Sequence, residues 1–474
     1  MNKVRQNFFT SLSYQIFILI LFIIKANPFL NSRRFTSVLM AAAVLCGGIY
    51  SLVIIVKNRQ KLIKNIYAYI LAAFIGCYCI TILVNYPVSF GENVKDILWF
   101  TIQIFTLFLI AFYSNQEQKD KNLKVLSWVY LCFTSIFAFI SIFFVFLRKG
   151  GVESYGKWGF LSQRLFGLYR SPNYGALYCA ISVIIAVGFF KASSKKIRVF
   201  LVFNCIVNFL YIVYSGSNTG RTALFAGIIL FLIMLVLKSK DRKILMRNLS
   251  YSFCVLLLTV SLFQAVKITS AKIINHSYNG NSSMTTDSLP TDSGDFSDQE
   301  DIITFERTDY VEGSELGNGR IIHWKRALKV YPHYPVFGTS LRGYNHAVNS
   351  VFPNVSKIEK AVSLENDFIT LLVCTGAVGL AIFFVFIIAA LIKLINLIYK
   401  LFVDKDYENL DKFAYPLIIV LMIAMSAVFT DAIVFTNVLQ SALFWISLGY
   451  ILSYNTKAGG KNVEAIAREE SLPK

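Results

Sequence analysis

Long apolar stretches separated by short polar segments run through the whole chain. Twelve of them approach or exceed the length of about 20 residues that a helix needs to cross a bilayer. The pattern predicts an all-α integral membrane protein with about twelve transmembrane helices and one large extracytoplasmic loop that carries short helices. The predicted spans are 8–24, 36–56, 66–84, 97–113, 125–147, 174–190, 199–214, 222–237, 250–267, 367–392, 413–429 and 432–453.

The composition narrows the class of protein. Of the 474 residues, 56% are hydrophobic and 15% are charged, whereas soluble globular proteins carry about 25% charged residues. So few charges cannot cover a water-facing surface, which excludes an ordinary soluble enzyme, an intrinsically disordered protein and a disulfide-stapled secreted domain. The eight cysteines lie in or beside apolar stretches, where we expect them to pack as apolar residues and not to form a metal or redox centre.

The positive charges indicate the orientation in the membrane. The net charge is +19, a value also seen in nucleic-acid-binding proteins, but most of the excess lies in short loops on one side. With the N-terminus inside, the inner segments hold 26 Lys and Arg residues and the short outer loops hold 10. Because basic loops stay in the cytoplasm, we expect both termini there and no nucleic-acid partner.

One long outer loop, 267–366, contains the other basic residues. Its first half, from Asn279 to Asp301, is acidic and poor in apolar residues, which predicts a mobile flap or linker. Its second half predicts a helix over 319–331 with one apolar face. That face consists of Ile321, Trp324, Leu328 and Tyr331. The chain then divides into N-terminal helices (1–150), core helices with outer arginine motifs (151–266), the loop (267–366), three C-terminal helices (367–453) and a cytoplasmic tail (454–474).

Four polar clusters lie on the predicted outer face, and polar groups at membrane depth are costly enough to indicate function. The first places Arg164 and Arg170 before a predicted helix. That helix begins near Pro172 and carries Asn173 in its first turn. A helix N-terminus beside two arginines suits an anion. The alternative is that these arginines bind lipid phosphates at the membrane surface.

The second and third clusters each centre on one arginine. Arg221 follows a tight turn between two spans, where it either binds substrate or snorkels to the membrane surface. Arg320 and His323 share one face of the predicted loop helix. All four histidines lie in the long loop, and without a pairing that suits a metal they are as readily structural or solvent-exposed.

The fourth cluster lies where the loop re-enters the membrane. Glu365 and Asp367 either stabilise the helix N-terminus or supply a general base held near arginines. Gly376 and Gly379 follow at a spacing that suits close helix packing. Together, the four clusters bring arginines and a carboxylate to one face beside hydrocarbon. Such a set suits a lipid-diphosphate substrate, because arginine forks hold the diphosphate and the carboxylate activates an acceptor hydroxyl.

The order of five motifs resembles the bacterial O-antigen ligase/polymerase superfamily of polytopic membrane glycosyltransferases. They are Arg164-Leu-Phe-Gly167 with Pro172-Asn173, Gly220-Arg221-Thr222-Ala223-Leu224, Asn318-Gly319-Arg320 with Trp324 and Ala327-Leu328, Pro335-Val-Phe-Gly338 with Gly343-Tyr344, and Glu365-Asn366-Asp367 with Thr375-Gly376 and Gly379-Leu380. Each motif is weak alone, but their order and spacing over about 160–380 make the resemblance specific.

The resemblance implies a glycosyltransferase in the bacterial cytoplasmic membrane that uses no cofactor, no metal and no nucleotide sugar. Such proteins transfer a saccharide from undecaprenyl diphosphate to an acceptor hydroxyl on the outer face. The acceptor is a second lipid-linked repeat unit in polymerases and a lipid or protein in ligases. The partners implied are the lipid-linked donor and acceptor, the bilayer and, for a polymerase of capsule or O-antigen, a flippase and a chain-length regulator. The substrate-binding residues expected are Arg221 and Arg320, with Arg164, Arg170, Asn173 and His323 beside them.

One residue departs from the family pattern. Ligases of the family have His before the Asn of the re-entry motif, and this chain has Glu365. A carboxylate can accept a proton as imidazole does, and polymerases often vary here, so Glu365 favours a polymerase. We expect Glu365 to be the catalytic base, with Asp367 as the alternative and Arg320 as the catalytic arginine. A ligase is the second hypothesis, and a polysaccharide flippase or transporter, which places charges at the membrane midplane, is the third.

Overall fold

The structure is a computed structural model. It describes residues 11–114, 116–153, 156–239, 241–279, 302–305, 320–353 and 364–454. The predicted acidic flap after Asn279, the Asn318-Gly319 start of the loop helix and the tail beyond Tyr454 lie outside the described residues.

Each of the predicted spans coincides with a helix, which confirms an all-α polytopic membrane protein. The helices are α2 (Ser11–Ala26), α3 (Arg33–Lys57), α5 (Ile66–Val84), α6 (Phe90–Thr101), α7 (Phe108–Tyr113), α8 (Gln116–Phe146), α9 (Pro172–Phe190), α10 (Lys195–Tyr214), α11 (Asn218–Leu237), α12 (Arg242–Asn279), α16 (Asp367–Val403), α17 (Tyr407–Ser426) and α18 (Leu439–Leu452). A π-helical turn, Ile102–Leu107, joins α6 to α7. Among the described residues, ten helical stretches are long and apolar enough to cross a membrane, and α2 and α18 are shorter apolar helices.

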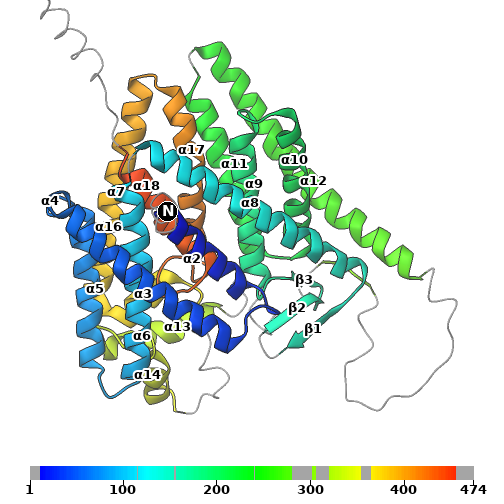
Figure 1. Cartoon of the computed structure of the whole chain (residues 1–474). Coiled ribbons are helices and arrows are strands. Elements are labelled where there is room, and N and C mark those ends of the chain that lie inside the picture. Colours follow the sequence, from blue (N-terminus) through cyan, green and yellow to red (C-terminus); the bar gives the residue numbers. More distant parts are fainter. Residues whose placement is uncertain are drawn as a thin grey trace, which may run out of the picture.

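The segments predicted to lie outside gather at one end of the helix bundle. Figure 1 shows the loop helices α13 (Arg320–Val330) and α14 (Tyr344–Val351) at its lower end, together with a small sheet. The turns between α11 and α12 and between α16 and α17, both predicted to lie inside, are at the upper end. Helix α9 is buried along most of its length and packs against α10, α11 and α17, so its first turn lies where the outer segments meet the bundle.

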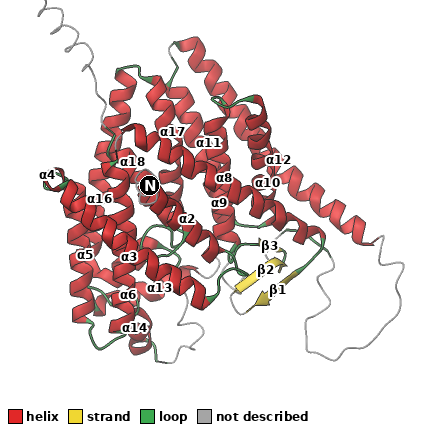
Figure 2. Ribbon diagram, in the orientation of Figure 1, coloured by secondary structure: helices red, strands yellow, loops and turns green. Residues whose placement is uncertain are grey.

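The sheet was not predicted from the sequence. It consists of three antiparallel strands, β1 (Gly150–Glu153), β2 (Gly156–Leu161) and β3 (Arg164–Gly167), and lies beside the bundle in Figure 2. The strands are short, and the turn between β2 and β3 uses Ser162 and Gln163 with φ of 48° and 59°. Positive φ at both positions is typical of a type I′ hairpin turn, usually signalled by Asn-Gly. Ser-Gln carries no such signal.

The loop helix forms as α13, but only half of the predicted apolar face turns inward: Trp324 and Tyr331 are half-buried, and the other two residues are exposed. Ile321 and Leu328 are 37% and 48% exposed, whereas Ala327 and Val330 are fully buried. The indole of Trp324 explains the rotation, because it donates a hydrogen bond of 2.8 Å to the carbonyl of Leu364 and so turns its side of the helix towards the re-entry segment. Arg320 lies one turn earlier on that same side.

The segment 335–343 docks against a break in α16. Gly376 has φ 68° and ψ −172°, which interrupts the helix, and Gly338 opposite it has φ 69°. Four backbone hydrogen bonds of 2.8–3.3 Å join the two: Thr339 N to Val373 O, Ser340 N to Cys374 O, Ala377 N to Pro335 O and Val378 N to Val336 O. Gly376 therefore serves loop docking and not the helix packing expected for it, because its backbone must meet another backbone at close range.

The other side of this docked segment binds α5 and α6. Thr81 donates to the carbonyl of Phe337 at 2.7 Å, and Arg342 forms a two-point ion pair with Asp96 at 2.6 and 2.9 Å. The hydrogen bond to Asp96 raises the pKa of the Arg342 guanidinium, so this arginine stays charged. The docked segment thus links α16 to α5 and α6, which lie far from it in the sequence.

Replacing Gly376 by Ala should destabilise the protein severely. The added Cβ would lie 2.2 Å from the carbonyl oxygen of Val336, and the backbone conformation is one that essentially only glycine adopts, at a cost of about 1–3 kcal/mol before any clash. We expect a lower thermal midpoint and a loss of monodisperse protein in detergent. Gly76→Ala is the matched control, since nothing lies within 4 Å of its Cβ position. Equal stability of the two variants would contradict the docking role.

Candidate functional site

An ion pair joins the loop helix to the start of α16. The Nε of Arg320 donates to Oε2 of Glu365 at 2.5 Å. The side chain of Arg320 is 11% exposed and that of Glu365 is 41% exposed. Two of the residues expected in the catalytic centre are thus in direct contact, and the carboxylate is the member that faces solvent. His323 is half-buried one turn along the same helix.

The backbone around Glu365 is held in an unusual conformation. Glu365 has φ 47°, in the left-handed region that costs a non-glycine residue about 1–2 kcal/mol. The next residue, Asn366, caps α16, because its Oδ1 accepts from the amides of Phe368 and Ile369 at 3.0 Å. Its Nδ2 also donates to the carbonyl of Val428. Asn366 therefore fills the capping role, which leaves Glu365 to point at Arg320. Strain of this kind concentrates at functional sites.

Asp367, the third residue of this motif, lies in the interior. It is 2% exposed, and its Oδ2 accepts from the amides of Ala432 and Ile433 at 3.0 and 2.7 Å. Those amides belong to the irregular segment 427–438, which connects α17 to α18. Because its backbone groups are not paired within a helix, side chains must satisfy them. Asp431, in the same segment, acts electrostatically on Asp367. The carboxylate of Asp367 thus anchors this segment.

A second buried network surrounds Arg164 at the start of α9. Its Nε donates to the carbonyl of Ser215 at 3.1 Å and its Nη2 donates to Oδ1 of Asn173 at 3.0 Å. The same Asn173 oxygen accepts from Ser217. The side chain of Arg164 is 4% exposed, so these bonds tie β3, the first turn of α9 and the turn before α11 together. Arg221 follows this turn near the surface, where its Nη2 donates to Asn218 at 3.0 Å.

Replacing Arg164 by Lys should weaken this junction. An ammonium group cannot reproduce the planar fork that reaches both Ser215 and Asn173, and a buried acceptor left without its donor costs about 1–3 kcal/mol. We expect a lower thermal midpoint in detergent and reduced transfer activity. Arg198→Lys is the control, since Arg198 also donates to two carbonyls but is exposed. A midpoint lowered no further by Arg164→Lys than by the control would contradict the inference.

Arg170 lines a cavity of about 330 Å³ next to these groups. The cavity lies between the end of α2, the first turns of α9 and residues 437–438. Its lining residues are Phe22, Lys25, Ala26, Tyr169, Arg170, Ser171, Tyr174, Tyr178, Asn437 and Val438. Tyr174 connects this cavity to the carboxylates, because Asp431, Glu365 and Asp367 all act electrostatically on it.

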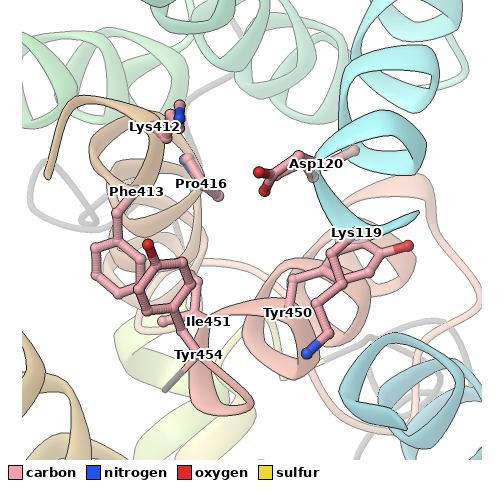
Figure 3. Close-up of a pocket in the computed structure, with 9 residues that line it drawn as sticks. Lys119, Asp120, Lys412, Phe413, Pro416, Tyr450, Ile451 and Tyr454 are labelled. Carbon is pink, nitrogen blue, oxygen red and sulfur yellow. The ribbon is translucent and has the colours of Figure 1, made fainter. Parts of the chain in front are cut away.

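A small pocket at the opposite end of the bundle differs in size and chemistry. It lies between α8, α17 and α18 and measures about 30 Å³, space for about one or two water molecules. Figure 3 shows Asp120 and Lys412 around it, with Tyr450 and Tyr454. Its volume excludes a glycan. Among the described residues, no three His, Cys, Asp or Glu side chains gather in a way that could hold a metal ion.

The sequence model of one protein family, described as O-antigen ligase, matches residues 200–384. This part of the chain is similar to the O-antigen ligase/polymerase superfamily. The resemblance inferred from the motifs is confirmed, and the match includes Arg221, Arg320, Glu365 and Asp367. The superfamily implies a membrane glycosyltransferase that acts on lipid-linked glycans. No curated protein sequence matches the chain.

Sequence reasoning missed three residues beside the site. Asp431 is the only charged residue between Phe413 and Ser453, a signal that was available but fell in a two-residue gap between predicted spans. Lys25 is one of the 10 basic residues of the short outer loops, and nothing else in the sequence distinguished it. Tyr174 carried no signal, because a tyrosine in an apolar helix is as readily part of the core.

Proposed function

We propose that the protein polymerises undecaprenyl-diphosphate-linked oligosaccharide repeat units into a surface polysaccharide such as a capsule or an O-antigen. The observation that carries this proposal is the ion pair between Arg320 and Glu365, which lies at the outer end of the bundle inside the matched segment. It puts a cation for the leaving diphosphate beside a carboxylate for the acceptor hydroxyl. In the family's ligases a histidine stands in place of Glu365, and this difference favours a polymerase.

The proposed reaction is one displacement at the anomeric carbon of the donor. Arg221 and Arg320 hold the diphosphate of the lipid-linked glycan. Glu365 accepts the proton of the acceptor hydroxyl, whose oxygen forms the new glycosidic bond with inversion. The bond from the anomeric carbon to the diphosphate oxygen breaks, and undecaprenyl diphosphate leaves with its charge stabilised by the arginines. No metal or nucleotide sugar takes part in this scheme.

The remaining site residues position these groups. Arg164 and Asn173 fix the turn that precedes Arg221, and His323 lies on the helix that carries Arg320. We place the site on the extracytoplasmic face of the bacterial cytoplasmic membrane, with both termini in the cytoplasm. A flippase would then deliver the repeat units, and a chain-length regulator would set the product size.

The direct test uses purified protein in lipid nanodiscs with one defined lipid-linked repeat unit and no added metal. We expect a ladder of products that differ by one repeat unit, together with released undecaprenyl diphosphate. Chelator should leave the ladder unchanged. The proposal fails if active, folded protein releases no diphosphate, or if release requires a divalent metal.

A ligase is the second candidate, because the matching family is described as O-antigen ligase. Loss of a polymerase in cells leaves single lipid-linked units, whereas loss of a ligase leaves long lipid-linked chains, so one gel of lipid-linked glycans separates them. The family match does not support the flippase or transporter. The arginines and carboxylates assigned to the site also lie at one end of the bundle and not at mid-helix breaks.

A further inference from the structure

The cavity that contains Arg170 is lined by two cations and three tyrosines. Lys25 and Arg170 supply the positive charge, and they lie close enough for Arg170 to repel Lys25. Tyr169, Tyr174 and Tyr178 also line the cavity. A volume of about 330 Å³ is within the range of small-ligand sites. Neither Arg221 nor Arg320 is among its lining residues.

Lys25 and Arg170 differ in exposure, because Lys25 is half-buried and Arg170 is exposed. Among the described residues, no Asp or Glu forms an ion pair with Lys25 or Arg170. The ammonium of Lys25 contacts only weak partners, the sulfur of Met40 at 3.4 Å and the ring of Phe22 at 5.9 Å. Arg170 instead contributes a backbone bond, from its amide to the carbonyl of Ala26, which fixes the two chain segments beside each other. Like charges this close repel each other, and an anion bound in the cavity would offset that repulsion.

We propose that this cavity binds the phosphoanion of a second lipid-linked glycan, the acceptor, while Arg221 and Arg320 hold the donor. This inference rests on the proposed polymerase function, because a polymerase must hold two lipid-diphosphate substrates at once. Tyr174, which is half-buried, offers an aromatic surface to the first sugars, whose C–H groups pack on aromatic rings.

The position of the cavity also fits the chemistry. Tyr174 lines the cavity, and Asp431 and Glu365 lie close enough to act electrostatically on it, so the proposed base is near this side of the cavity. An acceptor anchored by its diphosphate at Lys25 would extend its sugars past Tyr174. Its terminal hydroxyl would then reach Glu365, and the anomeric carbon of the donor would lie beside Arg320.

The test compares two acceptors with a fixed lipid-linked donor in phosphatidylcholine nanodiscs. One acceptor is a repeat unit on a short polyprenyl diphosphate, and the other is the same saccharide as a methyl glycoside. The wild type should use the diphosphate acceptor with a KM about tenfold or more lower, the effect of one or two charge-assisted hydrogen bonds. Lys25→Gln and Arg170→Gln should bring this ratio close to one, and Arg170→Lys should restore much of it. Lys95→Gln removes an outer cation that does not line the cavity and should keep the full ratio.

Each outcome decides between the hypotheses. If the wild type transfers glycan to neither acceptor, the proposed function fails. If transfer occurs but Lys25→Gln keeps the wild-type ratio, polymerisation stands and the acceptor site is wrong. A further arm adds phosphatidylglycerol to the nanodiscs. If this lipid competes as strongly as the diphosphate acceptor, and if the competition disappears in Lys25→Gln, the cavity is a general phospholipid site. That result would overturn the assignment.

Discussion

Replacing Glu365 by Gln should abolish polymer and leave single lipid-linked repeat units to accumulate. The change removes one proton acceptor and one charge while keeping the size of the side chain. General-base catalysis contributes about 10²–10⁴-fold to a rate, so transfer by the purified variant should fall by that factor. Electrophoresis of lipid-linked glycans from cells and diphosphate release in nanodiscs both measure it. Long polymer at normal levels, with normal protein abundance, would refute the catalytic role.

The same variant distinguishes a base from a residue that only orients the arginine. The amide oxygen of the introduced glutamine can still accept the hydrogen bond that Arg320 now donates to Oε2 of Glu365. If Glu365 only orients Arg320, the variant should therefore keep a substantial part of its activity. Glu92→Gln is the matched control, since Glu92 is an exposed glutamate in an ion pair with Lys95 at 2.8 Å. Its transfer rate should match the wild type.

The sequence was sufficient to predict the helices because their signal is local. A run of apolar residues near bilayer length forms a helix whatever it packs against, so each of the predicted spans contains one. The shorter features failed for the same reason. The hairpin turn at Ser162-Gln163 has no sequence signal, and the rotation of α13 depends on a bond from Trp324 to Leu364, 40 residues away. The break at Gly376 is set by the segment that docks on it.

The candidate site, like the fold, could be predicted from the sequence only in part. Motif order placed Arg320 and Glu365 in one site, and the structure joins them in an ion pair. Motif order could not show that Arg164 donates its hydrogen bonds to Ser215 and Asn173 inside the protein. In a sequence motif, Arg164 and Arg320 look alike. Burial separates a residue that shapes the site from one that can meet substrate, and burial is a property of the packed chain.

The roles of the two carboxylates at the re-entry motif are separated by Asp367→Asn and Asp367→Ala. The oxygen of an asparagine can accept from the amides of Ala432 and Ile433 as Asp367 does now. The neutral amide also removes a charge that Asp431 opposes. Asp367→Asn should therefore keep a near wild-type thermal midpoint and most of its transfer activity. Asp367→Ala leaves two buried donors without acceptors, at about 1–3 kcal/mol each, and should lower the midpoint and the activity together.

These expectations differ from those of a base at Asp367. A base there would make Asp367→Asn as inactive as Glu365→Gln while leaving its midpoint unchanged. Asp241→Ala is the control for losing an aspartate that accepts from a backbone amide, because Asp241 accepts from Ile244 at 2.8 Å on an exposed helix end. It should lower the thermal midpoint less than Asp367→Ala does. Measured in one series, the midpoints report the anchor of segment 427–438 and the transfer rates report the base. Activity in Asp367→Asn with none in Glu365→Gln would assign the proton to Glu365 and the backbone anchor to Asp367.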